Sequence, residues 1–287
     1  MIRFGPSGNS DLFYDQGYKS SLDAPLWIKN RGLSAYEYSF SRGINIGDFV
    51  AKSLGEKCRE NDVVLSIHAP YYINFANRDP RMIDKSIGYI ITSLKYMKIM
   101  GSHRLVFHPG SCSDMPREEA YSLLKQNIKL LVQRIDEEHF DFPFIICPET
   151  MGKQNQLGTF EEVGEICTYA DYLVPTLDFG HINALTQGSL KTEEDFENII
   201  KFLIDKIGLD KVKNIHIHFS KIMYKEKGEI KHLTFEDTEY GPEFEPLARV
   251  IKKYNLEPVV ICESRGTQAQ DASTMKEIYE RIIKESN

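Results

Sequence analysis

Short runs of β-branched and aromatic residues alternate with longer amphipathic stretches along the whole chain, and this alternation constrains the fold more than any other feature. Such a pattern is typical of parallel strands joined by helical crossovers. We expect eight strands, at residues 2–4, 36–40, 63–67, 105–107, 144–147, 173–177, 214–219 and 258–262. Eight strand–helix units in 287 residues predict an α/β protein, a (β/α)₈ TIM barrel that forms a single domain over residues 1–287.

The amphipathic stretches predict a helix after most of these strands. The expected helices cover residues 46–60, 81–100, 117–138, 159–170, 193–207, 243–254 and 271–284. Two of them begin with a capping signal, because Thr159 is followed by Glu162 and Thr192 is followed by acidic residues. The first crossover, at residues 18–30, has the weakest helical pattern.

Composition narrows the class of protein. A net charge of −7 argues against a protein that coats nucleic acid without sequence preference, because such binding relies on surplus Lys and Arg. It does not exclude a nucleic-acid enzyme, because bound divalent ions would supply positive charge in the site. The five cysteines are scattered without a C-x-x-C pair, so we expect no disulfide framework. No apolar run approaches the ~20 residues that cross a bilayer, and we expect a cytoplasmic protein with no membrane contact and no obligate protein partner.

Histidines and acidic residues stand at the ends of six consecutive expected strands. These residues are His68, His108, Glu149, Asp178 with His181, His216 with His218, and Glu263. Because barrels of this kind place their chemistry at the C-terminal ends of the strands, we expect these side chains to converge on one rim. One such residue alone is usually an ordinary surface group, whereas six consecutive strands indicate a functional site.

The ligand types indicate which metal this rim would bind. Imidazole nitrogens and carboxylate oxygens suit zinc and manganese, whereas calcium and magnesium sites are built mainly from oxygens. We therefore predict Zn²⁺ first and Mn²⁺ second. A carboxylate that bridges two ions would suit in-line displacement at phosphorus.

Six short motifs carry these residues in a fixed order. They read His-Ala-Pro-Tyr-Tyr-Ile-Asn at 68–74, Phe-His-Pro-Gly-Ser at 107–111, Pro-Glu-Thr at 148–150, Leu-Asp-Phe-Gly-His at 177–181, Ile-His-Ile-His-Phe-Ser-Lys at 215–221 and Cys-Glu-Ser at 262–264. Together they resemble the endonuclease IV family of apurinic/apyrimidinic endonucleases, within the xylose-isomerase-like barrel superfamily. The resemblance implies a barrel with two or three zinc ions. It also implies hydrolysis of double-stranded DNA 5′ to abasic sites in base excision repair, by in-line attack of a metal hydroxide.

The resemblance also implies roles for single residues. The metal ligands would be His68, His108, Glu149, Asp178, His181, His216, His232 and Glu263. Among them, Glu149 would bridge the first and second ions, and Glu149 and Glu263 would be the catalytic carboxylates. The candidate substrate-binding residues are Tyr71, Tyr72, Asn74, Lys221 and Arg265. In this family the loop that corresponds to Tyr71 and Tyr72 enters the DNA groove at the lesion.

The sequence departs from the family pattern at several positions. The first strand leads into Gly5-Pro6-Ser7, where the family usually has Gly-Ala-His. The third ion needs an Asp-x-His after the seventh strand, but the nearest match, from Glu229 to His232, contains one residue too many. His218 stands where the family usually carries Asn, and together with His216 it points to one face of its strand.

Two other functions remain open. A sugar isomerase or epimerase of the related barrels would need one ion, for which Glu149, Asp178, His216 and Glu263 would suffice. The acidic balance favours this alternative, whereas His68 and His108 favour the nuclease. A barrel that binds metal or nucleic acid without turnover is the third possibility.

Overall fold

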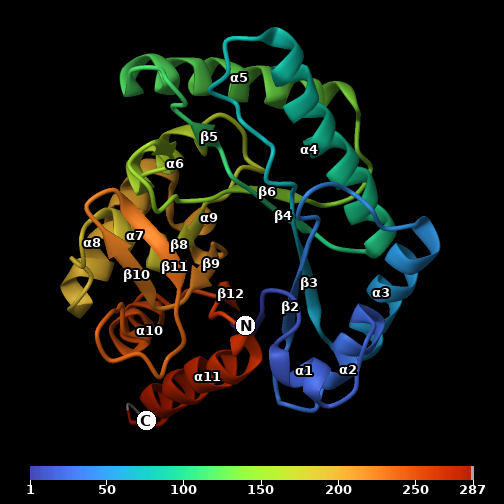
Figure 1. The fold of residues 1–287 in the computed structure, drawn as a ribbon, viewed down its shortest axis with the longest axis vertical. Coiled ribbons are helices and arrows are strands. Elements are labelled where there is room, and N and C mark those ends of the chain that lie inside the picture. The colour runs from blue at the N-terminus through green and yellow to red at the C-terminus, as the bar shows by residue number, and fades with distance from the viewer. Residues whose placement is uncertain (286–287) are drawn as a thin grey trace.

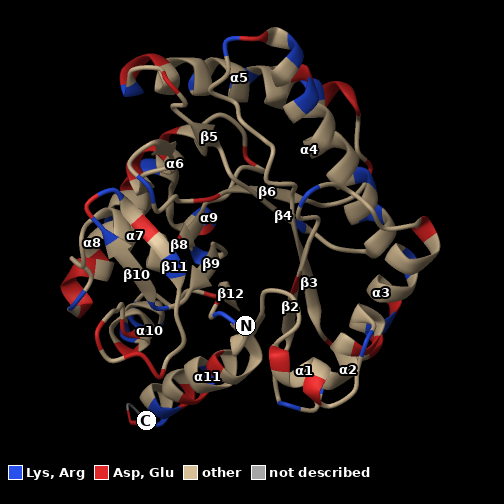
Figure 2. Cartoon of the chain, in the orientation of Figure 1, with Lys and Arg blue, Asp and Glu red and all other residues tan. Residues whose placement is uncertain are grey.

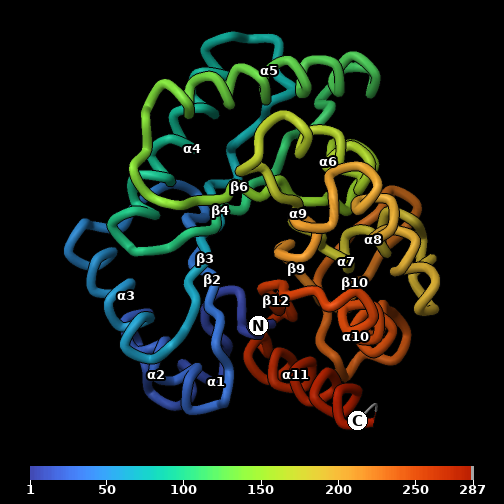
Figure 3. Tube along the Cα trace, turned by 180° about the vertical axis from the view of Figure 1, so that it is seen from behind, coloured from blue at the N-terminus to red at the C-terminus, as the bar shows by residue number. Residues whose placement is uncertain are grey.

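The computed structural model describes residues 1–285 and confirms the (β/α)₈ barrel, in which a ring of parallel strands is surrounded by helices (Figure 1). The eight barrel strands are β1 (Arg3–Pro6), β2 (Ala35–Ser39), β3 (Val64–His68), β4 (Arg104–Phe107), β6 (Ile145–Pro148), β8 (Thr176–Asp178), β9 (His216–Phe219) and β12 (Val259–Cys262). Each lies within about three residues of an expected strand. The view from behind shows the same ring of helices around the strands (Figure 3).

The ring is assembled from two arcs of four strands. One arc has the order β1-β12-β9-β8 and the other β2-β3-β4-β6, with all neighbours parallel. One bridge, from Ser7 to Glu37, joins the two arcs at the first junction, and two, from Ile146 to Leu173 and from Glu149 to Thr176, join them at the second. At the first junction a Cβ on Gly5 would overlap the backbone carbonyl of Ala35, so only glycine permits this close approach of β1 and β2.

The helices cover the outside of the ring. The long ones are α3 (Asp48–Glu60), α4 (Pro80–Met100), α5 (Arg117–Glu137), α8 (Glu193–Ile207), α10 (Phe244–Lys253) and α11 (Gln268–Lys284). The short ones are α1 (Asp11–Asp15), α2 (Ala24–Lys29), α6 (Phe160–Ile166), α7 (Phe179–Leu185) and α9 (Leu209–Lys213), with a 3₁₀ turn, η1, at Ser21–Asp23. Acidic and basic residues are interspersed along the outer helices (Figure 2).

Capping and apolar spacing explain where the helices form. In α4, Asp79 caps the start by accepting a hydrogen bond from the Arg81 backbone, and Gly101 ends the helix in the left-handed conformation at φ 64°. Its buried face includes Ile83, Ile87 and Ile90, which recur at helical spacing. Both expected capping signals are present as capping boxes, at Thr159 with Glu162 and at Thr192 with Asp195.

Two short antiparallel strand pairs stand on the C-terminal rim, where sequence patterns predicted none, and only the second is a hairpin of consecutive strands. Strand β5 (Gly110–Ser111) pairs with β7 (Gln156–Leu157), and β10 (Ile222–Lys225) pairs with β11 (Gly228–His232). A bridge between Lys153 and Gly228 connects the loop after β6 to the hairpin of β10 and β11. These additions fix loops that would otherwise have no regular structure above the barrel.

The cysteines lie in the core as free thiols. All five of them are buried. Burial raises the pKa of the thiols of Cys58, Cys147 and Cys262 to about 12, so they remain protonated small apolar groups at neutral pH. Within residues 1–285, no helix is long and apolar enough to cross a membrane.

Candidate metal centre

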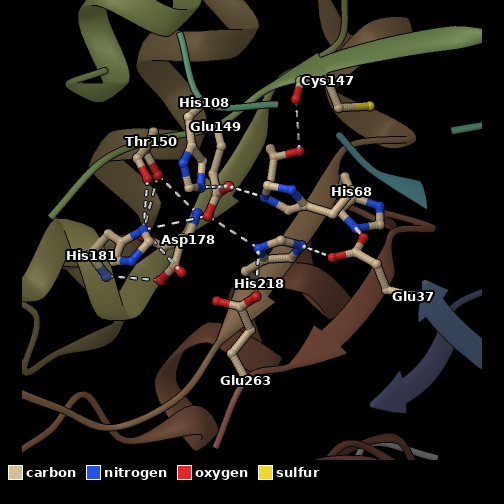
Figure 4. Close-up of polar contacts among 12 residues, drawn as sticks. Glu37, His68, His108, Cys147, Glu149, Thr150, Asp178, His181, His218 and Glu263 are labelled. Carbon is tan, nitrogen blue, oxygen red and sulfur yellow. Dashed lines mark hydrogen bonds and ion pairs between the residues drawn. The ribbon is translucent and has the colours of Figure 1, made fainter. Parts of the chain in front are cut away.

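A pocket of about 210 Å³ opens at the C-terminal rim of the barrel. Most of the histidines and carboxylates expected to form a site line it: His68, His108, Glu149, His181, His232 and Glu263. Glu149 lies at the centre of this arrangement (Figure 4). Its backbone continues from the end of β6, which places the carboxylate in the middle of the ring of strand ends.

The first group of ligand atoms surrounds one oxygen of Glu149. His68, at the end of β3, places its Nε2 atom 3.2 Å from Oε2, and His108, after β4, does the same at 3.2 Å. His68 also turns its Nδ1 atom to the carbonyl of Ala69, at 2.8 Å. If Nδ1 donates that hydrogen bond, the lone pair of Nε2 faces the pocket, as a metal ligand requires.

The second group gathers on the other oxygen. His218 on β9 places Nδ1 3.2 Å from Glu149 Oε1 and 3.5 Å from Glu263 Oε1. Asp178, at the end of β8, completes a set of four whose ligand atoms all lie within 4.8 Å of one another. Glu149 therefore belongs to both groups, which is the position of a bridging carboxylate.

The third group consists of His181 on α7 with Glu229 and His232 on β11. His181 turns Nδ1 to the carbonyl of Thr150 at 2.9 Å, while its Nε2 lies 3.5 Å from Glu229 Oε2. The Nε2 atom of His232 lies 4.0 Å from Glu229 Oε1 and 3.9 Å from Glu263 Oε2. The structure thus brings together His181, His232 and Glu229, although the spacing of Glu229 and His232 departs from the family pattern.

A β-bulge explains why the unusual spacing of Glu229 and His232 still works. In the hairpin, Ile222 is opposite His232 and Met223 is opposite Lys231, but Tyr224 is opposite Glu229, so Ile230 has no partner. Residues three apart on a regular strand face opposite sides, and one bulged residue restores them to the same side. The bulged Ile230 is half exposed, and the extra residue noticed in the sequence is accommodated there.

The structure separates His216 from the residues with which the family pattern grouped it. His216 faces the barrel interior one step below His218, and its Nε2 contacts Glu37 Oε2 at 3.0 Å. Its ligand atoms group with Glu37 and His218, not with Glu149, Asp178 and Glu263. The reason is the two-residue period of a strand: both histidines point inward, but only His218 is level with Asp178 at the rim.

The acids and imidazoles of this centre change each other's protonation. Burial raises the pKa of Glu149, but the charges of His218 and His108 outweigh it and hold the pKa well below its ordinary value. Burial lowers the pKa of His181, but the neighbouring Asp178 carboxylate raises it well above its ordinary value. Burial raises the pKa of Asp178 to about 6 despite the charge of His181. The clustered carboxylates therefore require positive charge close by.

The chemistry of these side chains fits divalent cations. Five carboxylates and six imidazoles meet in these three groups and in the set of Glu37, His216 and His218; Asp178 Oδ2, which is buried without an aligned hydrogen bond among the described residues, lies 3.1 Å from His181 Nδ1. Buried charges of one sign are stable only when paired or bound to a metal. Nitrogen and carboxylate oxygen together are a zinc or manganese donor set, and two of the groups share Glu149.

The candidate substrate residues lie in different surroundings. Tyr71 and Tyr72 are more than half exposed, and Tyr71 lines the pocket, where its ring stacks on His108 at 5.9 Å between centroids. Arg265 is exposed at the rim after β12. Asn74 is held in the loop, where its Oδ1 accepts hydrogen bonds from the backbones of Ala76 and Ser111.

Lys221 is also engaged with the protein itself. Its ammonium is buried, donates to the carbonyl of Asp237 at 2.7 Å and contacts Glu243 Oε1 at 2.6 Å. Neither Lys221 nor Asn74 lines the pocket, whereas Lys153, from the loop after β6, does. Of the two lysines, the one that lines the pocket is therefore Lys153 and not Lys221, which was expected to bind substrate.

Sequence patterns missed some members of the site. Glu37 was not singled out, although a carboxylate between Tyr36 and Tyr38 in a buried strand is a signal of an interior polar contact. The serines Ser7 and Ser39 also line the pocket, and nothing in the sequence marks either of them as a site residue. Their placement depends on how the strands close the ring.

Comparison with known proteins agrees with this fold. The family model described as "Xylose isomerase-like TIM barrel" matches residues 26–284. An uncharacterised protein of Methanocaldococcus jannaschii is 30% identical over 89% of this chain and 90% of its own length. A "Probable endonuclease 4" of Aquifex aeolicus is 28% identical, but the match covers 58% of this chain and 59% of that protein.

Solved structures of two kinds share the architecture. A D-tagatose 3-epimerase-like protein superposes with a TM-score of 0.70 at 23% identity, over 99% of each chain. Endonuclease IV from Thermus thermophilus superposes with a TM-score of 0.65 at 17% identity, also over 99% of each chain. At these identities the likeness establishes the fold alone. By fold and by sequence, the chain belongs to the xylose isomerase-like TIM barrel family.

Proposed function

We propose that this protein is a metal-dependent phosphodiesterase that resembles endonuclease IV and hydrolyses double-stranded DNA on the 5′ side of abasic sites. The observation that carries the proposal is the position of Glu149, whose two oxygens face separate groups of histidines. A centre of two or three ions around a shared carboxylate suits in-line displacement at phosphorus. The partial sequence similarity to endonuclease 4 proteins supports the same substrate class.

Bound zinc or manganese would act as a Lewis acid on the phosphoryl oxygens and lower the pKa of water in the pocket. The side chains that line the pocket would hold the ions and the substrate phosphate. Glu149 and Glu263 both line the pocket, and their carboxylates would hold the ions there. Lys153 lines the same pocket, and its ammonium would pair with a phosphate oxygen of the substrate.

The rim would receive the DNA. Tyr71, which lines the pocket, and the exposed Tyr72 that follows it belong to the loop after β3, and exposed aromatic rings there would stack on bases or fill the space left by a missing base. An abasic nucleotide has already lost its pairing, so moving it out of the helix costs less than moving an intact one. The overall charge of −7 makes local contacts and bound cations, not a general basic surface, responsible for affinity.

The test is incision of a labelled duplex that contains one abasic analogue. Purified protein is assayed as isolated, after prolonged chelation, and after zinc or manganese is restored. We expect one cut 5′ to the lesion, lost on chelation and regained with metal, and no cut in the same duplex without the lesion. Absence of incision with every metal, from folded and metal-loaded protein, contradicts the proposal.

A single-ion sugar isomerase or epimerase is the second candidate, and one observation favours it. Glu149, Asp178, His218 and Glu263 form a complete set for one ion without the other histidines. Two carboxylates beside one ion would also serve proton transfer next to a carbonyl group. Ketohexoses incubated with the metal-loaded protein and analysed by chromatography test this: a new epimer without DNA incision would replace the first proposal.

A further inference from the structure

A second polar cluster lies in the barrel interior beneath the candidate metal centre. Glu37 on β2 is fully buried, and its Oε2 accepts a hydrogen bond from the Ser66 hydroxyl at 2.9 Å. The same oxygen contacts His216 Nε2 at 3.0 Å, while Oε1 lies 2.9 Å from His218 Nε2. Figure 4 shows Glu37 on the opposite side of the His218 ring from Glu149. His218 therefore lies between two carboxylates.

The two ring nitrogens of His218 have different surroundings. Nδ1 faces the metal centre, within 3.2 Å of Glu149 and 3.5 Å of Glu263, whereas Nε2 faces Glu37. Among the described residues, neither His218 Nε2 nor Glu37 Oε1 has an aligned hydrogen bond to any group. Burial of a polar atom without a partner costs free energy, and the partner available to each of these two atoms is the other one.

Two other histidines of the centre place Nδ1 beside a backbone carbonyl, and a hydrogen bond donated there would fix their tautomer. His68 and His181 each turn Nδ1 to a carbonyl, of Ala69 and Thr150, and keep Nε2 for the pocket. The His218 ring has the opposite orientation, since its Nδ1 atom, and not Nε2, faces Glu149 and the metal centre. A neutral imidazole has one N–H, and the acceptor on the far side decides which nitrogen carries it.

We propose that Glu37 is a positioning residue that holds the proton of His218 on Nε2, so that the Nδ1 lone pair is directed at the second cation. The inference rests on the proposed metal centre and adds a residue that the resemblance does not assign. A carboxylate behind a ligating histidine fixes its ring orientation and increases its basicity, and loss of such a partner typically lowers metal affinity about 10–100-fold. His216 shares the carboxylate and occupies its other oxygen.

The first test is metal binding by Glu37→Gln, measured by competition with a chromophoric chelator. We expect the variant to bind as many ions as the wild type, with the affinity for one of them reduced about 10–100-fold. The visible spectrum of the Co²⁺-loaded protein should also change, because the ligand field of one ion is altered. Ser66→Ala is the matched control: it removes a hydrogen bond from the other oxygen of Glu37, and the Co²⁺ spectrum should stay as in the wild type.

The second test does not depend on a variant folding. Long-range ¹H–¹⁵N spectra of the zinc-loaded wild type report the tautomer of each histidine, and we expect His218 to carry its proton on Nε2 with Nδ1 bound to metal. A proton on Nδ1, or a Glu37→Gln protein with unchanged affinities and spectrum, overturns the inference. Loss of one whole ion from Glu37→Gln also overturns it, since Glu37 would then be a ligand. Wild-type protein that binds no ion would instead refute the metal centre itself.

Discussion

His218 Nδ1 lies 3.2 Å from Glu149 Oε1, and this contact joins two parts of the barrel that are separated in sequence by 69 positions. The other oxygen of Glu149 faces His68 and His108. One carboxylate therefore touches both groups of nitrogen ligands. Any change at Glu149 should disturb two cation sites together, whereas a change at His218 should disturb one.

Replacement of Glu149 by Gln should remove most of the bound metal. Because the amide carries no charge and cannot bridge two cations, we expect at most one ion per chain. Incision should fall by at least about 100-fold, since replacement of a residue that only hydrogen-bonds to a metal ligand already lowers activity about 10–100-fold. Elemental analysis and the incision assay measure the two effects. Glu194→Gln on α8, an exposed carboxylate outside the site, is the control and should behave as the wild type. Full metal content in Glu149→Gln would refute the bridging role.

His216 and His218 should respond differently to the same substitution. We expect His218→Asn to lose one ion, since Nδ1 faces Glu149 and Glu263. His216→Asn should keep every ion but lower the free energy of unfolding by about 1–3 kcal/mol, because it removes a partner of the buried Glu37 carboxylate. Metal analysis and urea unfolding separate the two variants. The reverse pattern would restore His216 to the role that the family resemblance implied.

The third group should be removable without loss of the other two. His232→Ala leaves the backbone pairing of β10 with β11 intact, so the hairpin should remain folded. We expect a protein that binds three ions to bind two after this change. A variant that deletes the bulged Ile230 is the matched control, because it leaves Glu229 and His232 two residues apart on a regular strand, on one face, and should retain the ion. If the ion count is unchanged in His232→Ala, the third group does not bind metal.

Tyr72 should contribute to substrate binding and not to folding. Its side chain is 56% exposed, so Tyr72→Ala should change the free energy of unfolding by no more than about 0.5 kcal/mol. Loss of a stacking contact should weaken binding of an abasic duplex by about 1–3 kcal/mol. Fluorescence anisotropy with a labelled duplex measures this, with Leu209→Ala, an exposed apolar residue that precedes β9 at the other end of the barrel, as control. Equal affinities for both variants would exclude Tyr72 from the DNA surface.

Much of this architecture was predictable because local signals and tertiary structure agree. The alternation of apolar runs predicted all eight barrel strands, and the capping pair Thr159 and Glu162 located the start of α6. The pairing of β5 with β7 on the rim was not predicted, since these strands have two residues each and pair across about 45 positions. Strand periodicity placed His216 and His218 on one face but carried no information about depth, which depends on the register of β9 against β8.

The contacts of Glu37 also could not be predicted from the sequence. Its strand was expected, yet its contacts with Ser66, His216 and His218 arise only when the barrel closes. The spacing of Glu229 and His232 departed from the family pattern, and only a bulge, which sequence periodicity does not predict, brings the two side chains together.

The number of ions bound per chain tests the central claim most directly. Protein purified without added metal, then loaded with zinc or manganese and freed of excess, is measured by elemental analysis against the protein concentration from amino-acid analysis. The geometry around Glu149 predicts two or three ions per chain. One ion per chain, unchanged when His68 and His108 are both replaced by Ala, would contradict the multi-ion centre and favour single-ion sugar chemistry.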